Sequence, residues 1–321
     1  MLSFLTRRVV LGVLVMWCVT VIVFLIFYVG PGAGDVARTL AGREASPATV
    51  ALIAHNLLLD RPWYVQYGHF LFQLLHGNLG YDYYNQEAVS TIVGQAFPVT
   101  LSLIVGAAPL WLAMGVLSGV YSAVRPRSLL DRLFTGIALL FYSTPTFVLG
   151  VLLILVLYYE ATVHGVAIFP PPGFTPLLQN PFEWFRGLIL PWLTLSLVLA
   201  AAYTRLARSS MLDVLGEDYV RTARAKGVSE QRVIFRHALR GAMTPIVTQA
   251  GIDVGLLFGG AVITEQVFGL PGLGWTAVHA IQQQDLPVII GVVIVAAAGV
   301  VVANIVVDIL YAVIDPRVRL H

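Results

Sequence analysis

Two aspartates lie inside long apolar runs of the sequence, where a charged group is costly. Asp253 and Asp308 fall in stretches hydrophobic enough to enter a bilayer, and insertion scales put the cost of a charge at the midplane at roughly 2.5 to 3.5 kcal/mol. Each carboxylate is therefore expected to face protein or water. One interpretation is that Asp253, with Gln249 and Glu265 near the two ends of its run, lines an aqueous path. The alternative is that Asp253 pairs within helix packing, and the sequence leaves the two open.

The surroundings of these aspartates also favour close helix packing. Glycines at four-residue spacing from Gly251 to Gly259 form a doubled G-x-x-x-G face around Asp253, which lets a second helix approach closely. Asp308 lies near the end of the last apolar run, where Arg317 or Arg319 can pair with it. We therefore favour a structural role for Asp308.

Sequence motifs for three kinds of catalysis are absent. A phosphate-binding G-x-x-x-x-G-K-[ST] loop is excluded because the only lysine, Lys226, follows Ala225 and precedes Gly227. Neither the H-E-x-x-H of zinc proteases nor the G-x-S-x-G of serine hydrolases occurs. The seven histidines are scattered, so no metal site is predicted. The chain is expected to be non-catalytic, and an intramembrane enzyme is a disfavoured alternative.

The composition is that of a membrane protein. Of the 321 residues, 58% are hydrophobic and 11% are charged, a balance far from that of a water-soluble domain. The net charge of +2 is too small to indicate a nucleic-acid partner. Cys18 is the only cysteine, so no intramolecular disulfide can form.

A transmembrane helix needs about 20 mostly apolar residues to cross roughly 30 Å of hydrocarbon. Six runs qualify, at 9–29, 99–121, 133–158, 188–206, 242–264 and 288–313. The first follows Arg7 and Arg8 as a signal peptide would, but it is long and has no evident small-x-small cleavage site, so we interpret it as a retained helix. The predicted fold is an all-α membrane protein with six transmembrane helices and a single domain over residues 1–321.

The basic residues predict the orientation of these helices. With the N-terminus inside, fifteen arginines and lysines fall on the inner side and four, Arg38, Arg43, Arg61 and Arg186, fall on the outer side. Because inner loops carry the excess of positive charge, we expect both termini to be cytoplasmic.

On this topology the long segment 31–97 lies outside the cell. It contains two stretches of helical periodicity, at 39–59 and 63–75. The second places four apolar residues on one stripe, namely Trp63, Tyr67, Phe70 and Leu74. We expect both stretches to pack as helices on the outer rim of the bundle.

The inner loop at 207–241 is the most informative polar segment. Four of its residues recur every fourth position, which predicts an amphipathic helix: Met211, Leu215, Tyr219 and Ala223. Gly227 is suited to a left-handed helix end, and the Ser229 side chain is suited to cap a second short helix. We expect a helix, a glycine turn and a helix on the cytoplasmic face. One alternative is that these basic helices simply rest on anionic lipid.

The sequence DYVRTARAKG at 218–227, followed by a basic amphipathic stretch, resembles the EAA loop of ABC importer permeases. In that family the loop forms a coupling helix that docks into a groove of the ATPase. Arg221 and Thr222 stand where the family often has glutamate and alanine, and Arg240 stands where many members have proline. The motif DYVRTARAKG is common in the dipeptide, oligopeptide and nickel branch of the family, so these differences from the general motif favour that branch.

Three further stretches resemble the same branch. They are LDRPWYVQY with HGNLG at 59–67 and 76–80, TEQVFGLPGLGWTAVHAIQQQDLP at 264–287, and DPRVR at 315–319. Together with the loop they span nearly the whole chain in the family's order. The long outer segment is similar to that of the B-type permease, which implies a type I ABC importer permease fold.

The resemblance implies a transmembrane pore subunit of an importer of dipeptides and oligopeptides in the bacterial inner membrane. It implies a second homologous permease, two ATPase subunits that hold the ATP and magnesium, an extracytoplasmic substrate-binding protein, and no cofactor in this chain. Asp253 would then meet the amino terminus of the peptide. The implied coupling residues are Glu217, Asp218, Tyr219, Arg221, Thr222, Ala223, Arg224, Lys226 and Gly227. The alternatives are a permease for nickel, glutathione or another small solute, and a secondary transporter that needs no ATPase.

Overall fold

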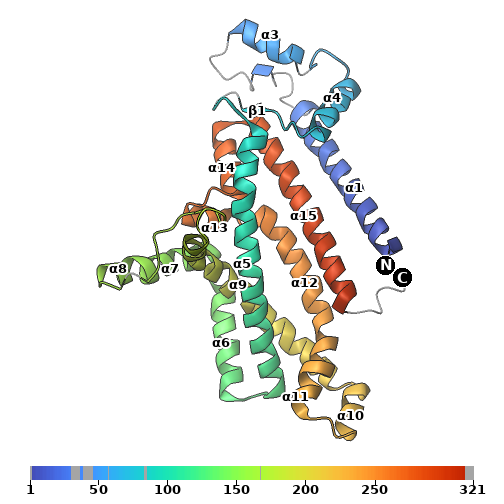
Figure 1. The fold of residues 1–321 in the computed structure, drawn as a ribbon, viewed down its shortest axis with the longest axis vertical. Helices are drawn as coiled ribbons and strands as arrows, with labels where there is room; N and C mark the ends of the chain where they lie inside the picture. Colours follow the sequence, from blue (N-terminus) through green and yellow to red (C-terminus); the bar gives the residue numbers. More distant parts are fainter. Residues whose placement is uncertain are drawn as a thin grey trace.

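The computed structural model describes residues 2–29, 37–38, 46–56, 58–82, 85–166 and 168–314. Six helical segments of this part are long and apolar enough to cross a membrane: Thr6–Tyr28, Val89–Val124, Thr146–Val163, Pro181–Leu215, Glu230–Gly259 and Leu286–Ile309. The predicted all-helical fold with six spans is confirmed. Figure 1 shows these helices as an elongated bundle with one arm projecting from its side.

The centre of the bundle is the pair α5 (Val89–Val124) and α9 (Pro181–Leu215). Glycines of α5 let the two backbones approach. A Cβ on Gly119 would lie 2.6 Å from the carbonyl oxygen of Thr204 and 2.6 Å from the Cβ of Ala207, and one on Gly115 would overlap Tyr203. α12 (Leu239–Gly260) and α15 (Leu286–Ile314) pack beside this pair, and α1 (Leu2–Phe24) lies outermost against α15 (Figure 1).

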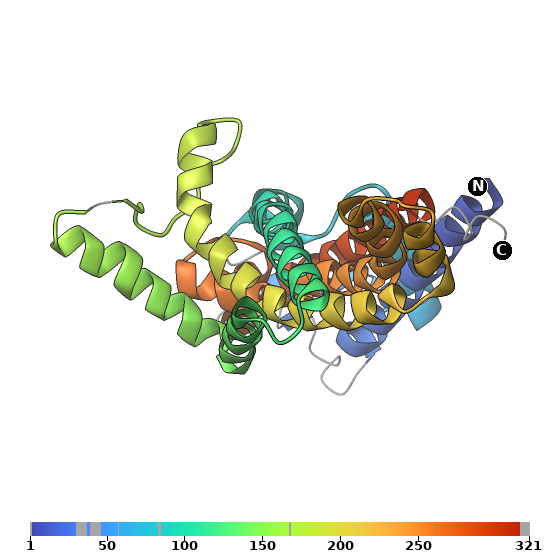
Figure 2. The ribbon, with the colours of Figure 1, turned by 90° about the horizontal axis from the view of Figure 1, so that it is seen from below.

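The third span was predicted with the wrong bounds and without its break. Instead of one helix over 133–158, the chain forms α6 (Leu129–Ser143), breaks at Thr144, and continues as α7 (Thr146–Leu153), the π-helical η3 (Ile154–Glu160) and α8 (Ala161–Val163). The cause is Pro145, which has no N–H to donate and forces the preceding residue into an extended conformation. α7 and α8 consequently project from the side of the bundle (Figures 1 and 2).

The first helix and the outer segment are joined by aromatic side chains. α1 runs on through a π-helical turn, η1 (Leu25–Val29), and α4 (Trp63–Leu75) packs against it. The Tyr67 hydroxyl lies 3.0 Å from the Thr20 hydroxyl, and the rings of Phe24 and Tyr67 are 5.2 Å apart. Of the predicted stripe, Phe70 and Leu74 also pack here, whereas Trp63 is 62% exposed. The other predicted outer helix is α3 (Pro47–Asn56), and residues 39–45 lie outside the described part.

A small hairpin, absent from the sequence prediction, leads the outer segment into α5. Strands β1 (Tyr81–Asp82) and β2 (Glu87–Ala88) are antiparallel, with Asp82 opposite Glu87. Asp82 is fully buried and accepts hydrogen bonds from the backbone and side chain of Asn85. Asp285, 9% exposed, caps the first turn of α15 by accepting the Val288 N–H. Burial and the hydrogen bond with Asp82 raise the pKa of Asp285 to about 7.

The Asp82 and Asp285 pair predicts that stability falls as pH rises from about 4 to about 7. In this window the folded protein keeps a proton on Asp285 that the unfolded chain, with a carboxyl pKa of 3.8, has released. Unfolding therefore releases a proton, and the free energy of unfolding decreases with pH. We expect Asp285→Asn to raise the melting temperature by a few degrees at pH 8 and to have little effect at pH 5. Equal effects of the substitution at both pH values would contradict the shared proton.

Candidate functional site

The segment between α9 and α12 forms the candidate coupling site. α10 (Asp218–Ala225) follows the end of α9, and Gly227 then turns the chain with a φ of +75°. The N–H of Gly227 binds the carbonyl of Arg224 at 2.9 Å, and that of Val228 binds the carbonyl of Ala223 at 3.3 Å. This left-handed helix end is the geometry predicted for Gly227, because residues other than glycine enter it at a cost.

Two details of the predicted segment are wrong. The second short helix is not separate, because α11 (Glu230–Arg232) continues through the π-helical η4 (Val233–Ala238) into α12. The Ser229 side chain makes no capping hydrogen bond among the described residues; its backbone carbonyl accepts the N–H of Val233 instead. α10 is therefore held between the ends of two transmembrane helices.

An apolar cluster fixes α10 on the end of the bundle. Its buried members come from α5, α9, α10, η4 and α12: Val120, Ala123, Met211, Val220, Ala223, Val233, Ile234, Ala238 and Ala242. The predicted stripe is correct for Met211 and Ala223 but not for Tyr219, which is 48% exposed. The break between α9 and α10 at Gly216 shifts the helical phase, so Val220 takes the buried position instead.

The other face of α10 is polar and accessible. Of the nine implied coupling residues, Ala223 is buried and eight are exposed: Glu217, Asp218, Tyr219, Arg221, Thr222, Arg224, Lys226 and Gly227. Arg224 reaches across the glycine turn to Glu230, with Nη2 to Oε1 at 2.8 Å, so an ion pair connects α10 to the start of the next span. Sequence reasoning missed this partner, although its separation of six residues across a turn is a usable signal.

Of the three residues predicted to line the aqueous path, Gln249 and Asp253 are hydrogen-bonded to each other and Glu265 lies apart from them. Asp253 accepts hydrogen bonds from the Gln249 side chain at 3.1 Å and from the Tyr203 hydroxyl of α9 at 2.7 Å. Gln249 is exposed and Asp253 is half-buried, so this carboxylate lies at the edge of an accessible face of α12. Tyr203 is 1% exposed, and no motif or spacing in the sequence pointed to it as a partner of Asp253. The glycine face predicted beside Asp253 is confirmed for Gly251 and Gly255, which pack against α15, but not for Gly259, where an added Cβ would meet nothing within 4 Å.

Glu265 does not join this group. It lies on α13 (Val262–Phe268), is fully buried, and accepts the Thr100 hydroxyl at 2.6 Å and the Trp275 N–H at 2.8 Å. Trp275 is in the first turn of α14 (Leu273–Gln283), where a carboxylate is favourable for the helix dipole. The Glu265 side chain therefore connects α13 to α5 and to α14 through hydrogen bonds.

Asp308 pairs within the chain, as expected, but with a different partner. Its Oδ2 lies 3.0 Å from Nη1 of Arg8 on α1, so the pair joins the first and last spans. Arg317 and Arg319, the partners considered from the sequence, lie outside the described residues, as does the DPRVR stretch.

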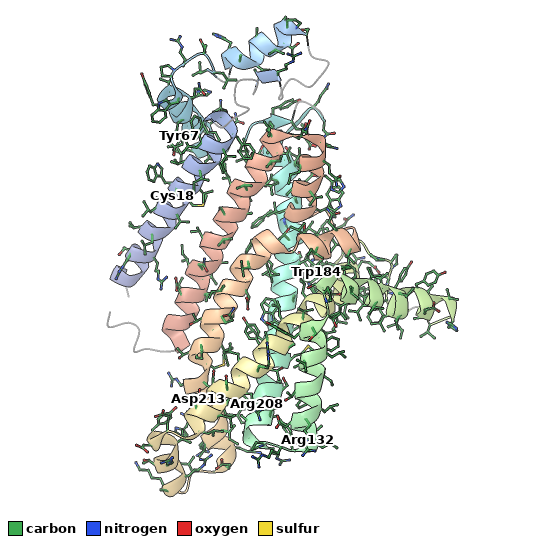
Figure 3. All side chains as sticks on the ribbon, turned by 180° about the vertical axis from the view of Figure 1, so that it is seen from behind. Cys18, Tyr67, Arg132, Trp184, Arg208 and Asp213 are labelled. Carbon is green, nitrogen blue, oxygen red and sulfur yellow. The ribbon has the colours of Figure 1, made fainter. Side chains whose placement is uncertain are left out.

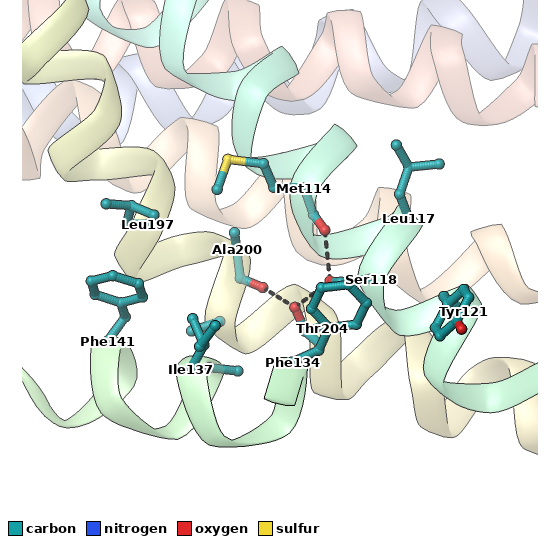
Figure 4. Close-up of a pocket in the computed structure, with 12 residues that line it drawn as sticks. Met114, Leu117, Ser118, Tyr121, Phe134, Ile137, Phe141, Leu197, Ala200 and Thr204 are labelled. Carbon is teal, nitrogen blue, oxygen red and sulfur yellow. Dashed lines mark hydrogen bonds between the residues drawn. The ribbon is translucent and has the colours of Figure 1, made fainter. Parts of the chain in front are cut away.

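A hollow lies between α5, α6 and α9 (Figure 4). It has a volume of about 460 Å³ and is lined by Met114, Leu117, Ser118, Tyr121, Phe134, Ile137, Ala138, Phe141, Leu197, Ala200, Ala201 and Thr204. The only polar contact across it joins the hydroxyls of Ser118 and Thr204 at 2.8 Å, as far as the described residues show. Such a lining can hold apolar groups but offers no site for a metal ion.

Comparison with known proteins agrees with the resemblance drawn from the sequence. Residues 115–320 match the family described as binding-protein-dependent transport system inner membrane component, and residues 1–104 match the N-terminal part of such membrane components. A putative peptide transport system permease protein of Brucella abortus (strain 2308) is 40% identical over 319 residues, covering 99% of each chain.

Two Escherichia coli relatives are almost as similar. The dipeptide transport system permease protein of strain K12 is 37% identical over 340 aligned residues, and the glutathione transport system permease protein of E. coli O6:H1 (strain CFT073) is 37% identical over 319 residues. Each alignment covers 99% of both chains. The chain therefore belongs to the family of binding-protein-dependent transport system inner membrane components, the permease subunits of ABC importers.

Proposed function

We propose that this chain is the pore subunit of an ATP-driven importer of dipeptides and oligopeptides, coupled to separate ATPase subunits through α10 and the turn at Gly227. Family membership makes it a non-catalytic membrane component, with ATP hydrolysis on partner ATPases. The observation that supports coupling is that α10 presents a charged, exposed face while its other face is fixed to the ends of three spans. A force applied to α10 by a docked ATPase would therefore be transmitted to the transmembrane helices on which α10 packs.

The partners we propose are a second homologous permease, two ATPase subunits and an extracytoplasmic binding protein. The pair of Gln249 and Asp253 supports the second permease, because it lies on a face of α12 that the single chain leaves accessible. A costly polar group at this depth requires water or protein beside it. A pore between two permeases would enclose the pair.

The proposed location is the bacterial inner membrane, with both termini and α10 in the cytoplasm. The basic residues exposed at the α10 end support this orientation, among them Arg221, Arg232 and Arg236. The alternative, that α10 only rests on lipid, is less well supported. The apolar side of α10 faces the bundle and not the bilayer, and its charged side is exposed to a protein partner.

The names of the relatives support two candidate substrates. Those named for peptide and dipeptide transport support a peptide, and the one named for glutathione transport keeps that small peptide-like solute as a second candidate. Nickel or another small solute is the remaining alternative within the class. A secondary transporter is not supported, because the family is defined by binding-protein-dependent systems.

The test is uptake by the assembled transporter in liposomes, with its ATPases and binding protein. We expect ATP-dependent accumulation of dipeptides that stops when the ATPases are omitted. If glutathione or Ni²⁺ accumulates and dipeptides do not, the proposed peptide substrate is wrong and the accumulated solute takes its place. Uphill transport by the chain without ATPases would contradict the function itself.

The path role of Asp253 predicts a change in substrate preference. If its carboxylate meets the ammonium group of a passing peptide, the wild type transports a free dipeptide in preference to its N-acetylated form, and Asp253→Asn loses this preference about tenfold. The estimate follows because a hydrogen bond to a charged group contributes about 1.5 to 3 kcal/mol, and 1.4 kcal/mol is a factor of ten.

The matched control for Asp253→Asn is Gln282→Ala, a polar residue exposed near the C-terminal end of α14. Both variants are compared with wild type using the same binding protein, so that selection by the binding protein cancels. An unchanged preference in Asp253→Asn would assign this carboxylate to helix packing with Tyr203 alone.

A further inference from the structure

An ion pair with a buried carboxylate and a half-buried guanidinium joins α6 to α9 close to the coupling segment. Arg208 of α9 donates from Nε to Oδ1 of Asp131 at 3.2 Å and from Nη2 to Oδ2 at 3.4 Å. The Asp131 side chain is 7% exposed and that of Arg208 is 35% exposed. The guanidinium holds the pKa of Asp131 below its usual value. Such a bidentate pair fixes the orientation of the two groups as well as their distance.

The same carboxylate organises the turn between α5 and α6. Its Oδ2 accepts the N–H of Arg127 at 2.8 Å, and Arg127 has a φ of +63°. Ser128 caps α6 by accepting the N–H of Asp131 at 3.1 Å. Arg208 therefore holds the whole turn, and not only one side chain, against α9.

Above this turn the hollow of about 460 Å³ borders α6 on the side that faces α5 and α9 (Figure 4). The buried residues of α6 are Asp131 and Ala138. At the far end of α6, the guanidinium of Arg205 lies 4.1 Å from the ring centre of Tyr142. Two arginines one turn apart on α9 thus attach the two ends of α6, and the attachment at Asp131 is the buried one.

Arg208 also lies on the direct route from α10. It precedes the end of α9 by two turns, and Met211 between them belongs to the apolar cluster that fixes α10. Figure 3 shows Arg208 on α9 near the base of α6, where Arg132 lies. α5 and α9 are in backbone contact at Gly119, whereas α6 borders the hollow. α6 also leads through Pro145 into α7.

We propose that Asp131 and Arg208 are positioning residues that transmit movement of α10 and α9 to α6, and through α6 to the α7 arm. The inference rests on the proposed coupling role of α10. Packed cores respond to a push by shifting between discrete arrangements, and a helix that borders a hollow and is attached to α9 near its two ends by side-chain contacts is suited to such a shift. Neither residue touches the solute; each acts through the helix that it holds.

The test compares Asp131→Asn and Arg208→Gln in the assembled transporter, measuring dipeptide uptake and ATP hydrolysis on the same liposomes. Asparagine can still accept the N–H of Arg127, so it removes the charge but leaves the turn. We expect peptide transported per ATP hydrolysed to fall about fivefold or more, the lower range of coupling between distant sites. The double variant should be no worse than either single variant, because the two remove one interaction.

Arg208→Lys keeps the charge without the forked geometry, and we expect it to restore part of the ratio even if the other variants assemble poorly. The matched control is Glu183→Gln, which breaks a surface pair with Arg186, 3.5 Å apart at the other end of α9, and should leave the ratio unchanged. An unchanged ratio per assembled transporter in Asp131→Asn, or additive losses in the double variant, would overturn the linkage.

Gly227→Val measured alongside separates this inference from the proposed function. If Gly227→Val loses uptake while Asp131→Asn keeps a normal ratio, the linkage is wrong and the coupling role of α10 stands. If both variants transport normally, the coupling role of α10 is wrong and the linkage falls with it.

Discussion

Replacing Gly227 with valine is expected to abolish uptake while the chain still inserts into the membrane. The φ of +75° at this position costs an L-residue roughly 1 to 2 kcal/mol and is worst for a β-branched side chain. A Cβ here would have no neighbour within 4 Å, so the effect arises from the backbone and not from a clash. The turn must change its path, and on the proposed coupling role α10 then changes its angle to the ATPase. Uptake is measured per amount of chain in the membrane.

A graded series at Gly227 provides the control. Asparagine tolerates the left-handed region better than alanine, and alanine better than valine. Uptake should therefore fall in the order glycine, asparagine, alanine, valine, while the amount of inserted chain stays constant. Normal uptake by the valine variant would contradict the coupling role of this turn.

The second large effect is expected from Gly119→Ala, which should reduce the amount of folded chain. Its new methyl would lie 2.6 Å from both the Thr204 carbonyl oxygen and the Ala207 Cβ. Backbone oxygen cannot rotate away, so α5 and α9 must separate. Overpacking of this kind costs about 1 to 3 kcal/mol, and a lower melting temperature in detergent measures it.

Gly136→Ala is the matched control, because a Cβ at this helical position of α6 meets nothing within 4 Å. Alanine is favoured over glycine in a helix by roughly 1 kcal/mol, so this variant should be as stable as wild type or more stable. A loss of stability at Gly136 equal to that at Gly119 would show that helix contact is not the cause.

Hydropathy predicted the number and type of the spans but not their course. Runs of apolar residues have to be buried in lipid as helices, so their existence follows from composition. The third span was misplaced because its apolar run does not stop at Pro145, and only backbone chemistry breaks it there. The hairpin at Tyr81 was missed because strands of two residues have no periodicity.

The candidate site was predictable where the chemistry is local. Gly227 was identified because a left-handed turn is a property of one residue. The helix before it was identified because apolar residues recur every fourth position there. The partners of Asp253 and Asp131 were not predictable, since Tyr203 is 50 residues from Asp253 and Arg208 is 77 residues from Asp131. Arg208 had been counted only as one of many inner-side arginines. Its role depends on which helices pack together.

The most direct test of the account is cross-linking from α10 in the assembled transporter. Cys18 is the only cysteine of this chain, so Cys18→Ala gives a background in which Thr222→Cys, exposed on α10, or Gln282→Cys, exposed on α14, is the single thiol of the chain. The account predicts that a short thiol-reactive cross-linker joins position 222 to an ATPase subunit and position 282 to none. A cross-link to the ATPase from position 282, or labelling of position 222 by a membrane-impermeant reagent added to whole cells, would contradict it.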